Sequence, residues 1–176
     1  NYLLDRGIPV SYSPGFLSGI GLAEHALMMM LCLSKNWTTA YKNAHSGVWY
    51  HPMNEELQGK TLGLVGFGGS ARELATRAWA MGMRTLAIDV LQVAPSVLSN
   101  CHVDYFGGAE DLSRLLAESD YLSLHVPSTP QTRHGSDRKA GAQMKKSACL
   151  INVARGEIVE ESALLDALLT GKVQGA

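Results

Sequence analysis

The sequence has few cysteines, almost no net charge and no hydrophobic run of the length that a membrane helix requires. Its cysteines are Cys32, Cys101 and Cys149, which lie far apart and lack the spacing of metal ligands. An odd and sparse set of thiols argues against a disulfide framework and favours a reducing compartment. We therefore expect a cytoplasmic protein with no bound metal.

Lysine and arginine do not cluster along the chain. With 15 basic and 16 acidic side chains, the formal net charge is -1. Scattered basic residues do not form the footprint of a protein that binds nucleic acid or an anionic membrane surface. The sequence has no basic segment followed by a cleavage site, so we do not predict a signal peptide. We expect neither a nucleic-acid partner nor a membrane association.

The most apolar run covers residues 20–33. It is shorter than the ~20 residues of a membrane helix, and Glu24 and His25 interrupt it. The run is apolar nearly all round, which is typical of a helix that is buried on more than one side. A second subunit or a neighbouring domain could cover its outer face, or the helix could lie wholly inside the core. The sequence leaves both interpretations open.

The rest of the chain alternates between apolar strands and helices, and its 176 residues are enough for one domain. A short strand at 8–12 ends at a Pro14–Gly15 turn, and a polar connection that contains aromatic residues covers 37–59. We predict strands at 60–68, 83–89, 102–106, 121–127 and 148–156, and helices at 70–82, 109–120 and 160–172, with a loop containing Pro95. Such alternation predicts an α/β fold, a Rossmann-type doubly wound parallel sheet with helices on both faces.

The segment "LVGFGGSARELA" places glycines between a strand and a helix. Gly66-x-Gly68-x-x-Ala71 has the spacing of a dinucleotide-binding turn. The first position makes the tight turn, the second lets a pyrophosphate approach the backbone, and the third lets the helix pack against the strand. The helix start then offers free N–H groups and a partial positive charge to the phosphates.

Asp89 ends the second strand of this unit, 23 residues after Gly66. A carboxylate at this position accepts hydrogen bonds from an adenosine ribose. Val90, Leu91 and Gln92 follow it, so no arginine is present to pair with a 2′-phosphate. These residues favour NAD over NADP as the cofactor.

Arg155 ends a later strand, next to Gly156. A planar, permanently charged guanidinium at the carboxyl end of a strand can bind the carboxylate of a ligand. Alternatively, Arg155 is a surface residue that pairs with Glu157 or Glu160.

The motifs "AEHAL", "GKTLGLVGFG", "SDYLSLHVPSTPQT", "LINVARGEIV" and "ALLDALLTGKVQGA" occur in this order. Together they closely resemble the D-isomer-specific 2-hydroxyacid dehydrogenases, which include phosphoglycerate, glyoxylate/hydroxypyruvate, D-lactate and formate dehydrogenases. The resemblance covers almost the whole chain. It implies an NAD-dependent oxidoreductase that acts on a small 2-hydroxy or 2-oxo acid and forms a homodimer through the apolar helix and the segment around Trp49.

The resemblance also implies roles for individual residues. The substrate-orienting catalytic residue would be Arg155, which would also lie near the nicotinamide. The residues expected to contact NAD are Gly66, Gly68, Gly69 and Ser70 at the pyrophosphate, Asp89 at the ribose, Val126 and Pro127 beside the adenine, and Val153, Ala154 and Arg155 near the nicotinamide. His125 matches a position in the cofactor pocket rather than a catalytic one.

Some features depart from the pattern of the family. The catalytic glutamate and histidine pair and most of the substrate domain correspond to sequence outside this chain. We therefore expect residues 1–15 to be a linker or the end of a preceding segment, and 16–176 to be a C-terminally incomplete NAD-binding domain that is inactive alone. Ser70 stands where an apolar residue is usual. In the segment 133–146, small or polar residues (Gly135, Ser136, Ala140 and Gly141) replace larger apolar ones, and this loss of apolar area predicts a loosely packed or displaced helix. A non-enzymatic NAD-sensing protein, similar to corepressors of this fold, or an inactive paralogue remains an alternative.

Overall fold

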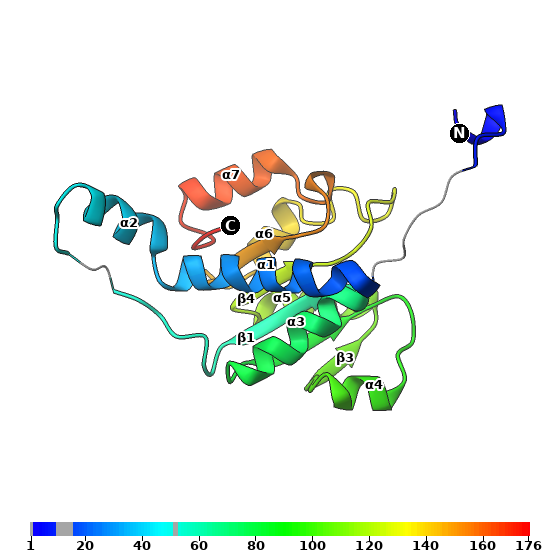
Figure 1. Ribbon diagram of the computed structural model, residues 1–176, viewed down its shortest axis with the longest axis horizontal. Helices are drawn as coiled ribbons and strands as arrows, with labels where there is room; N and C mark the ends of the chain where they lie inside the picture. The colour runs from blue at the N-terminus through cyan, green and yellow to red at the C-terminus, as the bar shows by residue number, and fades with distance from the viewer. Residues whose placement is uncertain (1, 10–15, 51–52) are drawn as a thin grey trace.

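The chain forms a parallel sheet between two layers of helices (Figure 1). The computed structural model describes residues 2–9, 16–50 and 53–176. The sheet has five strands in the order β3-β2-β1-β4-β5, and every neighbouring pair is parallel. The strands are β1 Thr61–Val65, β2 Arg84–Ile88, β3 Tyr105–Gly107, β4 Tyr121–Leu124 and β5 Cys149–Asn152. This order is that of a Rossmann-type sheet, and the predicted fold class is confirmed.

Two hydrophobic clusters, one on each face of the sheet, hold the layers together. On one face, α1, α3 and α4 supply apolar side chains, and on the other face α5, α6 and α7 do so. The helices are α1 Phe16–Ser34, α2 Trp37–His45, α3 Gly69–Ala80, α4 Pro95–Asn100, α5 Leu112–Glu118, α6 Arg138–Gln143 and α7 Glu161–Leu169, with short 3-10 turns at Leu4–Arg6, Ala109–Asp111 and Gly156–Ile158. Burial on both faces explains why the strands are almost continuously apolar.

Glycines stop two helices near the predicted positions. Gly82 follows α3 with a φ of 74°, and Gly171 follows α7 with a φ of 65°. This left-handed conformation is costly for residues with a Cβ atom and common after a helix.

Three local predictions need correction or lie partly outside the described residues. The connection at 37–59 contains the helix α2, and the expected loop at Pro95 is the start of α4, where proline is tolerated because its missing N–H needs no partner. Residues 8 and 9 form no strand, and the remainder of the strand predicted at 8–12, with its turn, lies outside the described residues.

The segment 133–146 contains the short helix α6, which packs against α5 and α7. The Asp137 side chain accepts a hydrogen bond from the Ala140 N–H at 2.9 Å and caps α6. Ala140 and Met144 are buried in the cluster shared with α5 and α7. This helix is therefore part of the core despite its small residues.

The α1 helix is buried on one side only. Ala23, Ala26 and Met30 are fully buried against the core, whereas the side chains of Ile20 and Met28 are 46% and 48% exposed. No helix in the described part of the chain is long and apolar enough to cross a membrane.

Candidate functional site

The carboxyl ends of four strands are aligned at one edge of the sheet. Val65 of β1 pairs with Ile88 of β2 and with Leu124 of β4, and Leu124 pairs with Asn152 of β5. The residues that follow these strands are therefore brought together, and they are Gly66, Asp89, His125 and Val153. The strand order reverses between β1 and β4, which is where ligands bind in open parallel sheets.

The first glycine of the turn has a conformation and surroundings that exclude a side chain. Gly66 is buried with a φ of 88°, and its N–H donates to the Ile88 carbonyl oxygen at 2.9 Å. A Cβ atom on Gly66 would lie 2.8 Å from Val126 Cγ1 and 3.0 Å from the His125 carbonyl oxygen. This glycine is required by the turn itself.

The second glycine leaves space beside the backbone. Gly68 is exposed, and a Cβ atom added there would meet no atom within 4 Å. The α3 helix begins at Gly69. Within the described residues, the first N–H of this helix with a backbone acceptor is that of Arg72, which donates to the Gly68 carbonyl oxygen at 3.0 Å. In the described chain, the N–H groups of Gly69, Ser70 and Ala71 have no acceptor, so they are available to an anion.

Asp89 contacts the turn directly. Its Oδ2 accepts a hydrogen bond from the Phe67 N–H at 2.7 Å, and its Oδ1 accepts from the Leu91 N–H at 2.9 Å. The side chain is half-buried. The structure thus places Asp89 beside the glycine turn, with a carboxylate that still has free acceptor capacity.

A histidine that follows β4 lies between two serine hydroxyl groups. His125 Nδ1 lies 2.9 Å from Ser70 Oγ, and its Nε2 lies 2.9 Å from Ser123 Oγ. Burial lowers the pKa of His125 to about 4, so the ring is neutral near pH 7. Sequence reasoning placed His125 in the pocket but missed this network; the unusual polar residue at position 70 was the available signal.

Arg155 has no ion-pair partner within the described residues. Its guanidinium donates to the Ala154 carbonyl oxygen at 2.8 Å, whereas Glu157 pairs with Arg133 at 2.8 Å. The alternative in which Arg155 pairs with Glu157 or Glu160 is therefore not observed. Arg155 is exposed and lines a cleft of about 990 Å³.

Asn152, which the sequence analysis did not single out, braces the loop before Arg155. Its Nδ2 donates to the Arg155 carbonyl oxygen at 2.8 Å, and its Oδ1 accepts from the Ala154 N–H at 3.0 Å. The only available sequence signal was its place at the end of β5.

The remaining predicted residues lie at the ends of β4 and β5. Val126, Val153 and Ala154 are half-buried and pack against the core, and Pro127 is exposed. Among the residues that the structure describes, no group of three or more His, Cys, Asp or Glu side chains could hold a metal ion.

Comparison with known proteins identifies similar sequences and structures. The profile described as "D-isomer specific 2-hydroxyacid dehydrogenase, NAD binding domain" matches residues 27–176. Hydroxypyruvate reductase of Thermotoga maritima is 38% identical over 174 residues, which are 98% of this chain and 54% of that protein.

Solved structures show the same similarity. Apo D-lactate dehydrogenase of Escherichia coli has a TM-score of 0.86 at 29% identity, covering 97% of this chain and 52% of that chain. D-lactate dehydrogenase of Lactobacillus jensenii with NAD+ has a TM-score of 0.82 at 31% identity, covering 98% and 51%. The chain spans about half the length of these relatives.

Proposed function

Because this chain belongs to the D-isomer-specific 2-hydroxyacid dehydrogenase family, as its NAD-binding domain, we propose that its protein transfers a hydride between NAD and a small 2-hydroxy or 2-oxo acid. The observation that carries this proposal is the alignment of strand ends that brings Gly66 and Asp89 to the same sheet edge as the loop of Arg155. The glycine turn suits a pyrophosphate, and the unpaired guanidinium suits a carboxylate.

The residues present fit NAD at this edge. The N–H groups at the start of α3 would hold the pyrophosphate beside the open space at Gly68, and Asp89 would accept from the adenosine ribose. Val126 and Pro127 would border the adenine, and Val153 and Ala154 the nicotinamide. When bound, the nicotinamide ring accepts or supplies the hydride.

Arg155 would orient the substrate acid. Its guanidinium is always charged and can form two parallel hydrogen bonds to a carboxylate, and the Asn152 hydrogen bonds fix the backbone from which it projects. The resemblance implies that a glutamate and histidine pair outside these 176 residues moves the proton.

We propose that the domain comprises residues 16–176 and that residues 1–15 belong to a linker or a preceding segment. In support, residues 2 and 3 and residues 5–9 are exposed, and the short turn Leu4–Arg6 stands apart from the sheet and its helices (Figure 1). We also propose a cytoplasmic location, because all three cysteines are free thiols.

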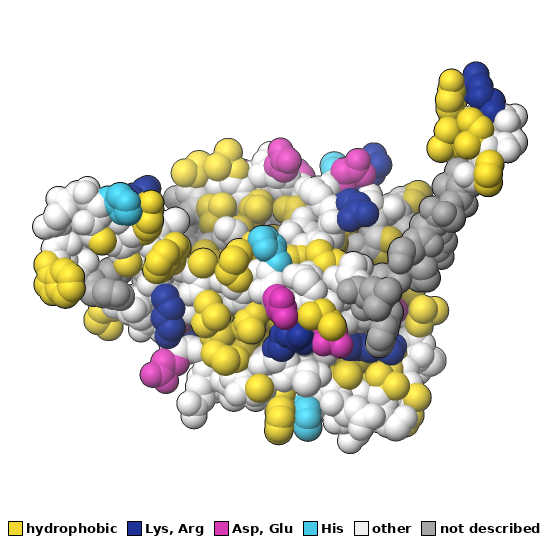
Figure 2. All heavy atoms as spheres, in the orientation of Figure 1, with side chains coloured by type: hydrophobic (Ala, Val, Ile, Leu, Met, Phe, Trp, Pro, Cys, Tyr) yellow, Lys and Arg dark blue, Asp and Glu magenta, His cyan; other side chains and the backbone are white. Residues whose placement is uncertain are grey.

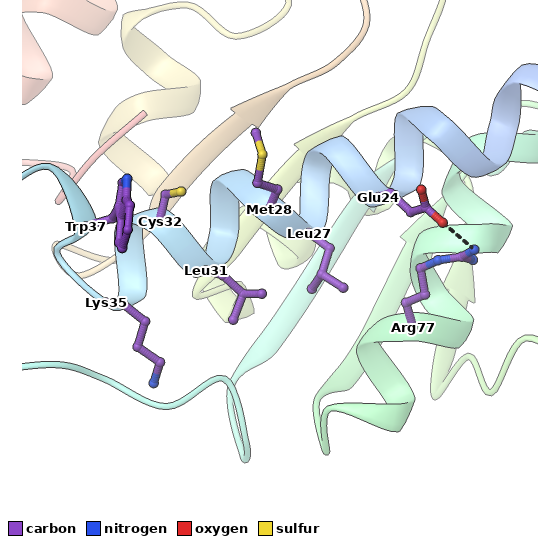
Figure 3. Close-up of a pocket in the computed structure, with 8 residues that line it drawn as sticks. All are labelled: Glu24, Leu27, Met28, Leu31, Cys32, Lys35, Trp37 and Arg77. Atoms are coloured by element: carbon purple, nitrogen blue, oxygen red, sulfur yellow. Dashed lines mark ion pairs between the residues drawn. The ribbon is translucent and has the colours of Figure 1, made fainter. Parts of the chain in front are cut away.

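A second copy of the chain is the proposed cover of the outer face of α1. A groove of about 460 Å³ lies there, lined largely by apolar side chains that include Leu27, Met28 and Leu31 (Figure 3). In Figure 1, α2 and the segment after it project to one side of the sheet, and Figure 2 shows apolar side chains on the surface at the same end of the molecule. The exposed aromatic residues of this part of the chain are Trp37, Tyr41, Trp49 and Tyr50. A homodimer would remove this surface from water, which is the usual role of a large apolar patch.

The two unusual features of the sequence do not favour an inactive paralogue. Ser70 makes a hydrogen bond to His125 rather than leaving a gap, and α6 packs through Ala140 and Met144.

To test the function, the intact protein would be titrated calorimetrically with NADH and assayed by NADH absorbance against a panel of 2-oxo acids. We expect binding and consumption of NADH with at least one acid; failure to bind NADH would contradict the proposal.

A further inference from the structure

His125 lies between two serine hydroxyls that come from different parts of the fold. Ser123 is in β4 and is completely buried, whereas Ser70 is the second residue of α3 and is half-buried. Both Oγ atoms lie 2.9 Å from a ring nitrogen of His125. The backbone N–H of His125 donates to the Val65 carbonyl oxygen at 2.8 Å, which fixes the His125 backbone beside the end of β1.

The ring can donate to only one of the two serines. Burial keeps the imidazole neutral, and a neutral imidazole has one N–H donor and one acceptor nitrogen. One serine must therefore donate its hydroxyl proton to the ring while the other accepts from it.

The burial of Ser123 decides between the two arrangements. Within the described residues, the hydrogen-bond partner of the Ser123 hydroxyl is His125 Nε2. If Ser123 accepted from Nε2–H, its own proton would be buried without an acceptor, which is unfavourable. Ser123 therefore donates to Nε2, the ring proton is on Nδ1, and Nδ1–H donates to Ser70 Oγ.

This arrangement leaves the Ser70 proton unused. In the part of the chain that the structure describes, the Ser70 hydroxyl has no acceptor for it. Ser70 stands among the free N–H groups at the start of α3, beside the open space at Gly68.

We propose that the Ser70 hydroxyl donates a hydrogen bond to the pyrophosphate of NAD and that His125 and Ser123 are positioning residues that set its direction. The inference rests on the proposed function. Ser70 is a side-chain donor at a position where the family usually has an apolar residue. This chain would therefore bind the phosphates with a hydroxyl group that relatives with an apolar residue at this position lack.

Affinity measurements on the intact protein test the Ser70 contact. Calorimetric titrations with NADH, ADP and adenosine would compare the wild type with Ser70→Ala and Ser70→Thr. A hydrogen bond to a charged group predicts that Ser70→Ala weakens NADH and ADP binding about tenfold. Adenosine lacks phosphate and should bind unchanged, and Ser70→Thr should restore most of the affinity. Thr76→Ala is the control, because it removes an exposed hydroxyl from the same helix.

Two further measurements test the positioning role. Nitrogen-15 NMR of the wild-type imidazole should show the proton on Nδ1. His125→Leu should weaken NADH binding in the wild type but add little to Ser70→Ala, since His125 acts through the hydroxyl.

The outcomes separate this inference from the proposed function. A wild type that does not bind NADH overturns both. If the wild type binds NADH, the inference alone is overturned by Ser70→Ala affinities within twofold of the wild type, by equal losses for ADP and adenosine, or by a ring proton on Nε2.

Discussion

The carboxylate of Asp89 accepts a hydrogen bond from the backbone N–H of Phe67 at 2.7 Å. Phe67 stands between Gly66 and Gly68, so this bond ties the end of β2 to the turn that follows β1. A carboxylate oxygen can accept more than one hydrogen bond. Asp89 can therefore hold the turn in shape while it binds a ribose.

Replacing Asp89 separates these two roles. Asp89→Asn keeps an oxygen that can accept from Phe67 but removes the charge that would repel a 2′-phosphate. We expect the ratio of kcat/KM for NAD over NADP to fall about tenfold or more. Asp89→Ala also removes the bond to the turn and should weaken NAD binding itself. Steady-state kinetics of the intact protein with both cofactors checks this, and an unchanged ratio would rule out the assignment of Asp89.

Substitution of Arg155 should affect the substrate much more than the cofactor, although Arg155 is also expected near the nicotinamide. Lysine cannot reproduce the planar pair of hydrogen bonds to a carboxylate. Arg155→Lys should lower kcat/KM for the preferred 2-oxo acid on the order of 10²-fold. The NADH dissociation constant should change by less than about threefold, because lysine keeps the positive charge near the nicotinamide. Arg133→Lys is the matched control, because Arg133 lines the same cleft but is paired with Glu157. Equal losses in both variants would argue against a special role for Arg155.

The chain of 176 residues should bind NADH without turning over a substrate. Proton transfer by a positioned group contributes about 10²- to 10⁴-fold, and orienting the reactants up to roughly 7 to 11 kcal/mol. The chain has Arg155 but no residue matched to the proton-transferring pair. Calorimetry should therefore show weak NADH binding. Absorbance assays with glyoxylate and hydroxypyruvate should show no consumption of NADH. Steady NADH consumption by the purified chain would contradict this prediction.

A charge in the groove beside α1 should dissociate the proposed dimer. Met28 is 48% exposed and lines this groove with Leu27. Met28→Lys would place an ammonium group in an apolar interface, so we expect a monomer by light scattering where the wild type is a dimer. Leu169→Lys introduces the same charge on α7 and should leave the dimer intact. A monomeric wild type at micromolar concentration would exclude this interface.

His125 should make the fold less stable in acid. Its pKa is lowered from 6.5 to about 4 in the folded chain. Between these values the unfolded chain binds a proton that the folded chain does not, so the free energy of unfolding falls as the pH decreases from 6.5 towards 4. The full effect is on the order of 3 kcal/mol. Urea unfolding at pH 7.5 and pH 4.5 should show a smaller decrease for His125→Gln than for the wild type, and equal decreases would assign the acid sensitivity to other groups.

Local patterns were sufficient to predict the sheet and the cofactor turn. Strands that are buried on both faces must be apolar, and the turn after β1 cannot accept a side chain at Gly66. Both features can therefore be recognised from short stretches of consecutive residues. The start of α4 at Pro95 and the helix α2 were missed. Proline is tolerated at the first position of a helix, so Pro95 did not mark a loop. The helix α2 buries none of its residues, so it is not part of the core pattern from which the other helices were predicted.

The amino-acid sequence by itself determined the parallel α/β fold, the glycine turn and the acidic residue at the end of β2, because each depends on short-range patterns of burial and backbone conformation. Only the tertiary structure decided the partners of the charged and polar side chains. Ser70 and His125 are 55 positions apart in the sequence, and they form a hydrogen bond because α3 begins beside the end of β4. Glu157 pairs with Arg133, and among the described residues Arg155 has no ion-pair partner. Hydrogen bonds and ion pairs act over a few ångströms, so their partners depend on how distant segments pack.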